Sequence, residues 1–182
     1  NTLDSMTLDE KIGQLFIVSA YGNNDTNAIT ALRETISKYN VGGLCFFQGS
    51  ADIQAKLTNE YQQLSKYPLL ISMDAEFGLG MRLKSDGFSF PKQLTLGAIQ
   101  NNHLIYDTGL NMASHLKRMG VHLNFAPVLD INNNPSNPVI NERSFGSDKI
   151  LVTNKSYAYM QGLQDGGILA CAKHFPGHGD TD

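Results

Sequence analysis

Five short apolar segments, each separated from the next by a stretch with helical spacing, constrain the fold of this 182-residue chain more than any other feature. Continuous apolar runs of four to eight residues are typical of buried strands, and apolar residues repeating every three or four positions are typical of helices. Their alternation predicts a parallel sheet covered by helices on both faces. The expected strands are Leu15–Ala20, Val41–Phe47, Pro68–Asp74, Val121–Asp130 and Ile168–Phe175.

Helix boundaries are indicated by residues that cap helix ends. Thr7 and Glu10 form the pattern of a capping box, in which each side chain bonds the backbone of the other. Gly120 follows a helical segment and is typical of a helix end. Further helices are expected to begin near Asn27, after Ser50, at Asn101 or Asn102, and at Lys149, the last ending near Gln164.

Composition excludes several classes of protein. The chain is 41% apolar and 17% charged, as expected of a globular domain with a buried core. Its net charge of -3 and scattered Lys and Arg residues do not favour nucleic-acid binding. No apolar run reaches the roughly 18 residues of a membrane helix, and the polar N-terminal residues do not resemble a signal peptide. Gly-rich dinucleotide and phosphate-binding motifs are absent.

Cys45 and Cys171 both lie in apolar, strand-like runs. We expect two buried free thiols, because free Cys is among the most buried residue types. A disulfide or a catalytic thiol is the next alternative. A metal pair is disfavoured, since the sequence has no CxxC spacing.

Polar residues at the strand ends favour a barrel over a doubly wound sheet. Asp74 and Asp130 each end an expected strand, Arg143 lies in the loop after Asp130, and Lys173 and His174 come near the end of the last strand. The strands of a (β/α)8 barrel converge on one face, where active sites lie. Because such barrels have eight strands and about 250 residues, we expect only the first five β/α units in this chain.

Each of these residues also has a purely structural interpretation. Asp74 could cap a helix or pair with Arg82, with Glu76 in an accessory position. Arg143 could lie on the surface, although an arginine fork is suited to paired contacts with oxygen ligands. Lys173 follows an apolar run, where an unpaired lysine is costly to bury, so a polar pocket is expected around it.

The last ten residues, KHFPGHGDTD, combine titratable side chains with a backbone that Pro176 and Gly177 keep from being helical. His174, His178, Asp180 and Asp182 could bind a metal, but no helix would hold the two histidines on one face. A flexible loop that carries a histidine over an active site is the preferred hypothesis. We therefore expect no metal.

The segment from Lys173 to Asp180, KHFPGHGD, closely resembles the β-N-acetylglucosaminidases of glycoside hydrolase family 3. The motifs FAPVLDINNNP, NPVI, ERSF and DAEFGLGMR resemble the same group, and the last is similar to its Bacteroidetes-like variant. The likeness extends over essentially the whole chain. It implies a (β/α)8 barrel and a retaining mechanism, with the terminal sugar bound by residues that match Asp74, Arg82, Arg143, Lys173 and His174.

The resemblance places the catalytic residues outside these 182 residues. The acid/base histidine belongs to an Asp-x-His unit expected after Asp182, and the nucleophilic aspartate comes near strand seven; His178 and Asp180 have supporting roles. Residues 1–182 are therefore expected to form the N-terminal part of one barrel domain and to be inactive alone.

The leading hypothesis is a bacterial exo-β-N-acetylglucosaminidase that acts on peptidoglycan fragments or related glycans without a cofactor. A metal-dependent barrel hydrolase and a non-catalytic sugar-binding module are the alternatives. The resemblance further implies a periplasmic or exported protein, in some members with a C-terminal serine-hydrolase-like domain.

Overall fold

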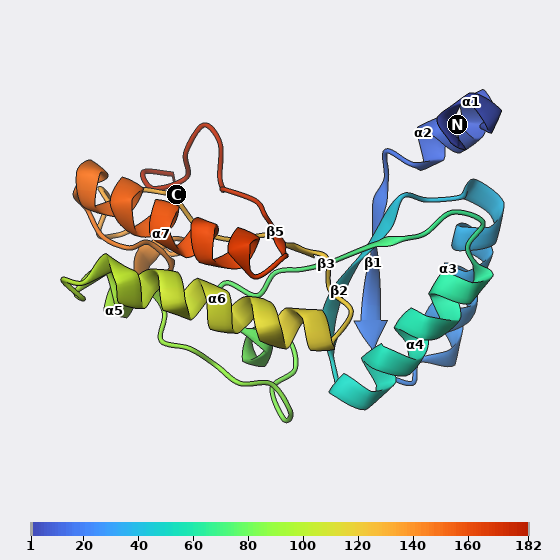
Figure 1. Cartoon of the computed structure of the whole chain (residues 1–182), viewed down its shortest axis with the longest axis horizontal. Coiled ribbons are helices and arrows are strands. Elements are labelled where there is room, and N and C mark those ends of the chain that lie inside the picture. Colours follow the sequence, from blue (N-terminus) through green and yellow to red (C-terminus); the bar gives the residue numbers. More distant parts are fainter. Residues whose placement is uncertain (1, 182) are drawn as a thin grey trace.

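The computed structural model describes residues 2–181, whose five strands form one parallel sheet in the order β1-β2-β3-β4-β5 (Figure 1). A sheet that adds parallel strands in chain order is the arrangement of a (β/α) barrel, whereas a doubly wound sheet reverses its order at a switch point. The expected fold class is confirmed as a partial barrel. The strands are β1 (Ile17–Gly22), β2 (Gly43–Gly49), β3 (Leu70–Met73), β4 (Leu123–Asn124) and β5 (Leu169–Ala170).

Two short helices precede β1 and the other helices lie between the strands, largely where the sequence predicts them. The capping box is confirmed, because Glu10 donates its backbone N–H to Thr7 Oγ1 and Thr7 donates its own to Glu10 Oε2. Ser50 occupies an N-cap position, but its hydroxyl bonds Asp52 rather than a backbone N–H. The helices are α1 (Thr2–Ser5), α2 (Leu8–Gly13), α3 (Thr26–Tyr39), α4 (Ala51–Leu64), α5 (Gln93–Gly97), α6 (Asn102–Arg118) and α7 (Lys149–Asp165), with short 3₁₀ turns η1 (Leu79–Met81) and η2 (Asn141–Arg143).

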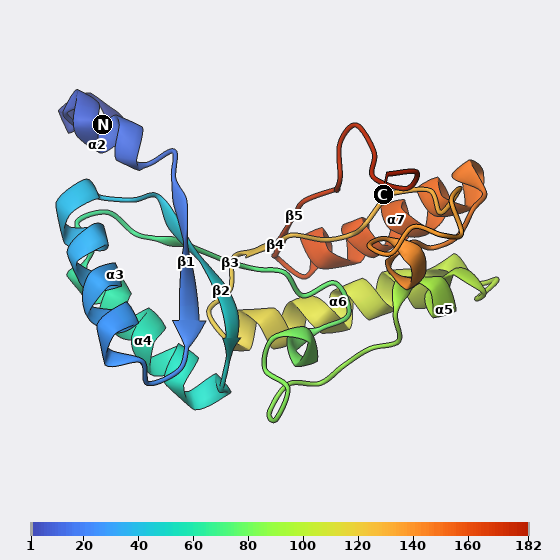
Figure 2. The same ribbon diagram turned by 180° about the vertical axis from the view of Figure 1, so that it is seen from behind.

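The longer helices pack in two pairs, α3 with α4 and α6 with α7, and both views show each pair side by side (Figures 1 and 2). A single buried core joins them to the sheet. Among residues 2–181 we find no helix that is both long and apolar enough to cross a bilayer.

The prediction of a sheet covered on both faces is wrong for β1. Leu15 is 83% exposed and Phe16 56% exposed, and in β1 only Ala20 and Gly22 are buried. The strand begins two residues later than expected, and within the described residues it pairs on one side only, with β2. An edge strand of this kind buries mainly the side chains that face the helices.

Two other strands are much shorter than predicted. β4 and β5 form a ladder of two residue pairs, after which one isolated bridge joins Val128 to Lys173. Pro127 has no backbone N–H to donate, so regular pairing cannot continue through it. The irregular segments beyond β4 and β5 carry the polar residues that sequence reasoning assigned to strand ends.

Candidate active site

Asp74 directly follows β3 and is held by an arginine that comes eight residues later in the chain. Arg82 Nη2 donates to Asp74 Oδ2 at 2.9 Å, and Arg82 Nε donates to the Asp74 carbonyl oxygen at 3.1 Å. The guanidinium carbon also lies 4.8 Å from the centre of the Phe47 ring, at the end of β2. Two neighbouring strand ends therefore fix the position of this carboxylate.

Lys173 joins two carboxylates. Its Nζ lies 2.8 Å from Asp74 Oδ1 and 2.7 Å from Glu76 Oε1. Its backbone is fixed by the segment after β4, since it donates to the Pro127 carbonyl oxygen at 3.1 Å and accepts from Leu129 N at 2.6 Å. The lysine thus has the charged partners that its place after an apolar run required.

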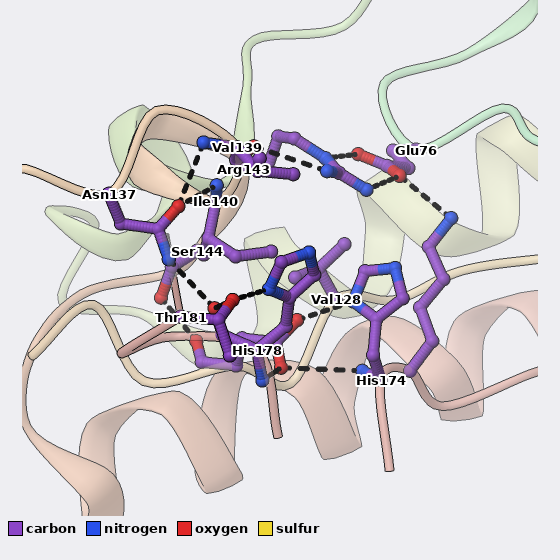
Figure 3. Close-up of polar contacts among 12 residues, drawn as sticks. Glu76, Val128, Asn137, Val139, Ile140, Arg143, Ser144, His174, His178 and Thr181 are labelled. Carbon is purple, nitrogen blue, oxygen red and sulfur yellow. Dashed lines mark hydrogen bonds and ion pairs between the residues drawn. The ribbon is translucent and has the colours of Figure 1, made fainter. Parts of the chain in front are cut away.

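Arg143 reaches the same cluster through Glu76. Its Nε and Nη2 donate to the two oxygens of Glu76 at 2.9 and 2.8 Å, the paired geometry that strengthens arginine–carboxylate contacts. Figure 3 shows the guanidinium facing this carboxylate. Burial raises the pKa of Glu76, but the hydrogen bonds and charges of Arg143 and Lys173 outweigh burial and hold the pKa below its ordinary value.

A second pair lies beside the cluster. His174 Nδ1 is 2.6 Å from Asp130 Oδ2, and the Asp130 side chain is fully buried. A carboxylate at this position accepts the Nδ1 hydrogen, so it fixes the ring orientation and leaves Nε2 for another contact. The His174 side chain is 34% exposed, so its ring remains accessible.

The loop after His174 folds back onto Asp130. His178 N donates to Asp130 Oδ1 at 2.7 Å, and the rings of His174 and His178 lie nearly perpendicular with their centres 5.6 Å apart. His178 Nδ1 contacts the Thr181 hydroxyl. A cavity of about 400 Å³ opens here, lined in part by Asp130, Lys173, His174 and the exposed Asp180.

The five residues expected to bind a sugar therefore meet at one end of the sheet. Asp74, Arg82 and Lys173 are in direct contact, and Arg143 joins them through Glu76. His174 follows Lys173 in the chain and pairs with Asp130. The three cationic side chains at this end of the sheet can donate hydrogen bonds to the hydroxyl groups of a sugar, and the two carboxylates can accept hydrogen bonds from them.

Sequence reasoning missed part of this arrangement. Glu76 was expected only as an accessory residue, yet it is 3% exposed and binds two of the cations. Asp130 was expected at a strand end, with no indication that it would hold the histidine loop. The available signal was the presence of two carboxylates two residues apart in DAE, just after an expected strand, both of which contact Lys173 in the structure.

The metal-site alternative gains no support from the geometry. Within residues 2–181, no three His, Cys, Asp or Glu side chains are grouped as metal ligands would be. His174 and His178 each direct Nδ1 to a protein oxygen, and Asp182 lies outside the described residues. That the site works without a metal remains a prediction.

The two cysteines are free and half-buried, less buried than expected. Cys45 lies in β2, and burial raises the pKa of its thiol. A raised pKa keeps the thiol protonated near neutral pH, which does not favour a catalytic thiolate.

Comparison with protein families gives one match over nearly the whole chain: residues 7–182 fit the Glycosyl hydrolase family 3 N terminal domain. The chain is 39% identical over 163 residues to Beta-hexosaminidase A of Pseudoalteromonas piscicida, covering 82% of this chain and 27% of that protein. It thus spans well under half the length of that relative.

Solved structures agree in fold. A glycoside hydrolase family 3 β-N-acetylglucosaminidase from Paenibacillus sp. superposes with a TM-score of 0.84 and 38% identity over 97% of this chain and 34% of that chain. The β-glucoside phosphorylase BglX superposes with a TM-score of 0.87 and 28% identity over 98% of this chain and 32% of that one.

Proposed function

Because the chain belongs to glycosyl hydrolase family 3, we propose that the protein containing it is a retaining exo-β-N-acetylglucosaminidase. The observation that carries the proposal is Lys173, which joins Asp74 and Glu76 at the end of the sheet where barrel enzymes bind their substrates. The names of the hexosaminidase and acetylglucosaminidase relatives support the choice of sugar.

In this proposal the polar cluster holds the terminal N-acetylglucosamine. Asp74 accepts hydrogen bonds from sugar hydroxyls, while Arg82, Arg143 and Lys173 donate to them. His174 presents its free Nε2 to a further hydroxyl. The ion pairs hold these groups in place before the sugar arrives, which lowers the entropic cost of binding.

The chemical steps need two further groups. A retaining enzyme donates a proton to the leaving oxygen, forms a covalent glycosyl-enzyme intermediate, and then hydrolyses it with water. We propose that an acid/base histidine and a nucleophilic aspartate from the rest of the same barrel domain supply these steps. Residues 1–182 would be its N-terminal part, with peptidoglycan fragments or related glycans as substrates and a serine-hydrolase-like domain as a possible further unit.

Turnover of chromogenic glycosides by the full-length protein tests the proposal. We expect release of p-nitrophenol from p-nitrophenyl N-acetyl-β-glucosaminide, little release from the β-glucoside, and no loss of activity with EDTA. Residues 1–182 alone should release none. Activity abolished by EDTA and restored by zinc would favour the metal hydrolase, and sugar binding without turnover would favour the binding module.

Because one similar structure is a phosphorylase, whether water or phosphate accepts the sugar from the enzyme needs a separate test. Replacing the buffer with inorganic phosphate and identifying the product by mass spectrometry answers it. The proposal of a hydrolase predicts free N-acetylglucosamine under both conditions, and its 1-phosphate as the main product would contradict it.

A further inference from the structure

Asn137 connects the two loops that carry the candidate site. It lies between Pro135 and Pro138 in the segment after β4 and is only 1% exposed. Its Oδ1 accepts from Val139 N at 2.8 Å and Ile140 N at 2.9 Å. Its Nδ2 donates across to the carbonyl oxygen of His178 at 2.7 Å, in the loop after β5.

Each end of this side chain leads to a residue of the site. The Val139 carbonyl oxygen accepts from Arg143 Nη1 at 3.1 Å, and Arg143 binds Glu76. On the other side, the His178 N–H donates to Asp130, and the His178 carbonyl oxygen accepts from Asn137 Nδ2 and, within the loop itself, from the Thr181 hydroxyl at 3.1 Å. Figure 3 shows Asn137 placed between the Arg143 segment and His178.

The loop from Pro176 to Thr181 has little else to fix its path. Pro176 is exposed, and Gly177 has a φ of +151° with no atom within 4 Å of where a Cβ would lie, so this part of the loop is loosely packed. Gly179 instead lies so close to the Ile131 carbonyl oxygen that a Cβ would collide with it. The loop is therefore anchored at His178 and Gly179, against the segment that Asn137 belongs to.

We propose that Asn137 is a positioning residue that clasps the Pro176–Thr181 loop onto the Arg143 segment. This inference rests on the proposed function, in which the same loop leads to the acid/base histidine. The clasp then determines where the proton donor is presented, while the sugar ligands Asp74 and Lys173 lie outside its reach. A misplaced donor lowers the rate of the chemical step more than it weakens binding of the sugar.

The variant Asn137→Asp removes the hydrogen bond to His178 and keeps the local hydrogen bonds to Val139 N and Ile140 N. The carboxylate still accepts from Val139 N and Ile140 N, but it cannot donate to His178 and repels that carbonyl oxygen instead. Asn134→Asp is a matched control in the same segment, because Asn134 only accepts, from Ser136 N at 3.0 Å, and the aspartate can do the same.

Hydrogen exchange of the full-length protein measures the clasp directly and needs no turnover. We expect the amides of residues 178–181 to exchange about tenfold faster in Asn137→Asp than in Asn134→Asp, because losing the clasp lowers the cost of opening the loop. Equal exchange in the two variants would overturn the inference. Should Asn137→Asp not fold, Asn137→Ser has the same expected and contradicting results, since serine can accept locally but cannot reach His178.

Kinetics then test the positioning role. With p-nitrophenyl N-acetyl-β-glucosaminide, Asn137→Asp should lower kcat about tenfold or more, while the inhibition constant of N-acetylglucosamine changes less than threefold. An unchanged kcat in a variant with faster loop exchange would refute the positioning role. If Asn137→Asp exchanges faster but the wild-type protein turns over no N-acetylglucosaminide, the clasp is supported and the proposed function is refuted.

Discussion

At the scale of one residue, Lys173 shows how a charge that is costly to bury is paired and at the same time held in position as a hydrogen-bond donor. Its side chain is 13% exposed and contacts Asp74 and Glu76, so the charge is paired where it could not remain alone. The same pairing holds its ammonium group at the mouth of the sheet. A hydroxyl group that replaces water there meets a donor already in position.

Lys173→Ala should therefore weaken binding of N-acetylglucosamine to the full-length protein. Losing a charged hydrogen bond costs about 1.5–3 kcal/mol, or roughly 10- to 150-fold in Kd. Lys56→Ala is the control, because Lys56 lies on the surface with only a weak contact to Asp52. Calorimetry measures both, and an unchanged Kd for Lys173→Ala would show that the lysine is purely structural.

Glu76 should make stability depend on pH in the acidic range. Because its pKa in the folded protein lies below the ordinary value of 4.5, its stabilisation is present above pH 4.5 and is lost as the pH falls through the lower, folded value. Near neutral pH, Glu76→Gln should cost about 3 kcal/mol, the low end for breaking a buried ion pair, because Arg143 loses its charged partner Glu76 while Lys173 keeps Asp74.

Thermal unfolding at pH 6 and pH 3 tests this linkage. The difference in Tm between wild type and Glu76→Gln should narrow at the lower pH. Glu34→Gln, an exposed change on α3, should leave Tm nearly unchanged at both. A gap that stayed constant or widened towards pH 3 would contradict the lowered pKa.

At the scale of elements, the close contact of α6 and α7 depends on two glycines. A Cβ at Gly109 would collide with the Tyr159 carbonyl oxygen, and one at Gly162 with that of Tyr106. Helices approach this closely only where one side has no side chain. The pair in turn places Tyr159, which donates its hydroxyl to the Glu76 carbonyl oxygen at 3.1 Å.

Gly162→Ala should consequently destabilise the protein, although alanine favours a helix. Overpacking of this kind typically costs about 1–3 kcal/mol. Asn154→Ala on the exposed side of α7 is the control and should be neutral or slightly stabilising. Urea unfolding measures both variants, and a Gly162→Ala protein as stable as the control would mean that the helices can separate without cost.

The sequence predicted elements better than it predicted their edges. Helix α6 begins after Asn101 as its cap indicates, the alternation of strands and helices predicted the parallel sheet, and the polar residues at the strand ends favoured the barrel. The lengths of β4 and β5 were not predicted, because Val121–Asp130 is mainly apolar and indicates a single strand, whereas its regular pairing ends at Asn124, ahead of Pro127. Motifs identified Asp74 and Lys173, but Asn137 acts through a contact 41 residues away, which no local pattern records.

At the scale of the molecule, the described residues form a sheet with two open edges, at β1 and at β5. Leu15 and Phe16 are exposed beside β1, Leu169 is 57% exposed in β5, and an apolar groove of about 610 Å³ lies between α2 and α3. Unpaired strand edges and exposed apolar side chains normally require a cover. In the proposed domain organisation, the remaining strands and helices of the barrel cover these edges and apolar side chains.

A crystal structure of the full-length protein with N-acetylglucosamine tests the central claim most directly. We predict that the sugar binds at the ends of β3 and β5, with hydroxyl oxygens about 3 Å from the Asp74 carboxylate and Lys173 Nζ. Arg143 and His174 should contact the same ring. A sugar bound elsewhere, with the contacts of Lys173 to Asp74 and Glu76 unaltered and no ligand beside them, would contradict the assignment of this cluster as the sugar-binding site.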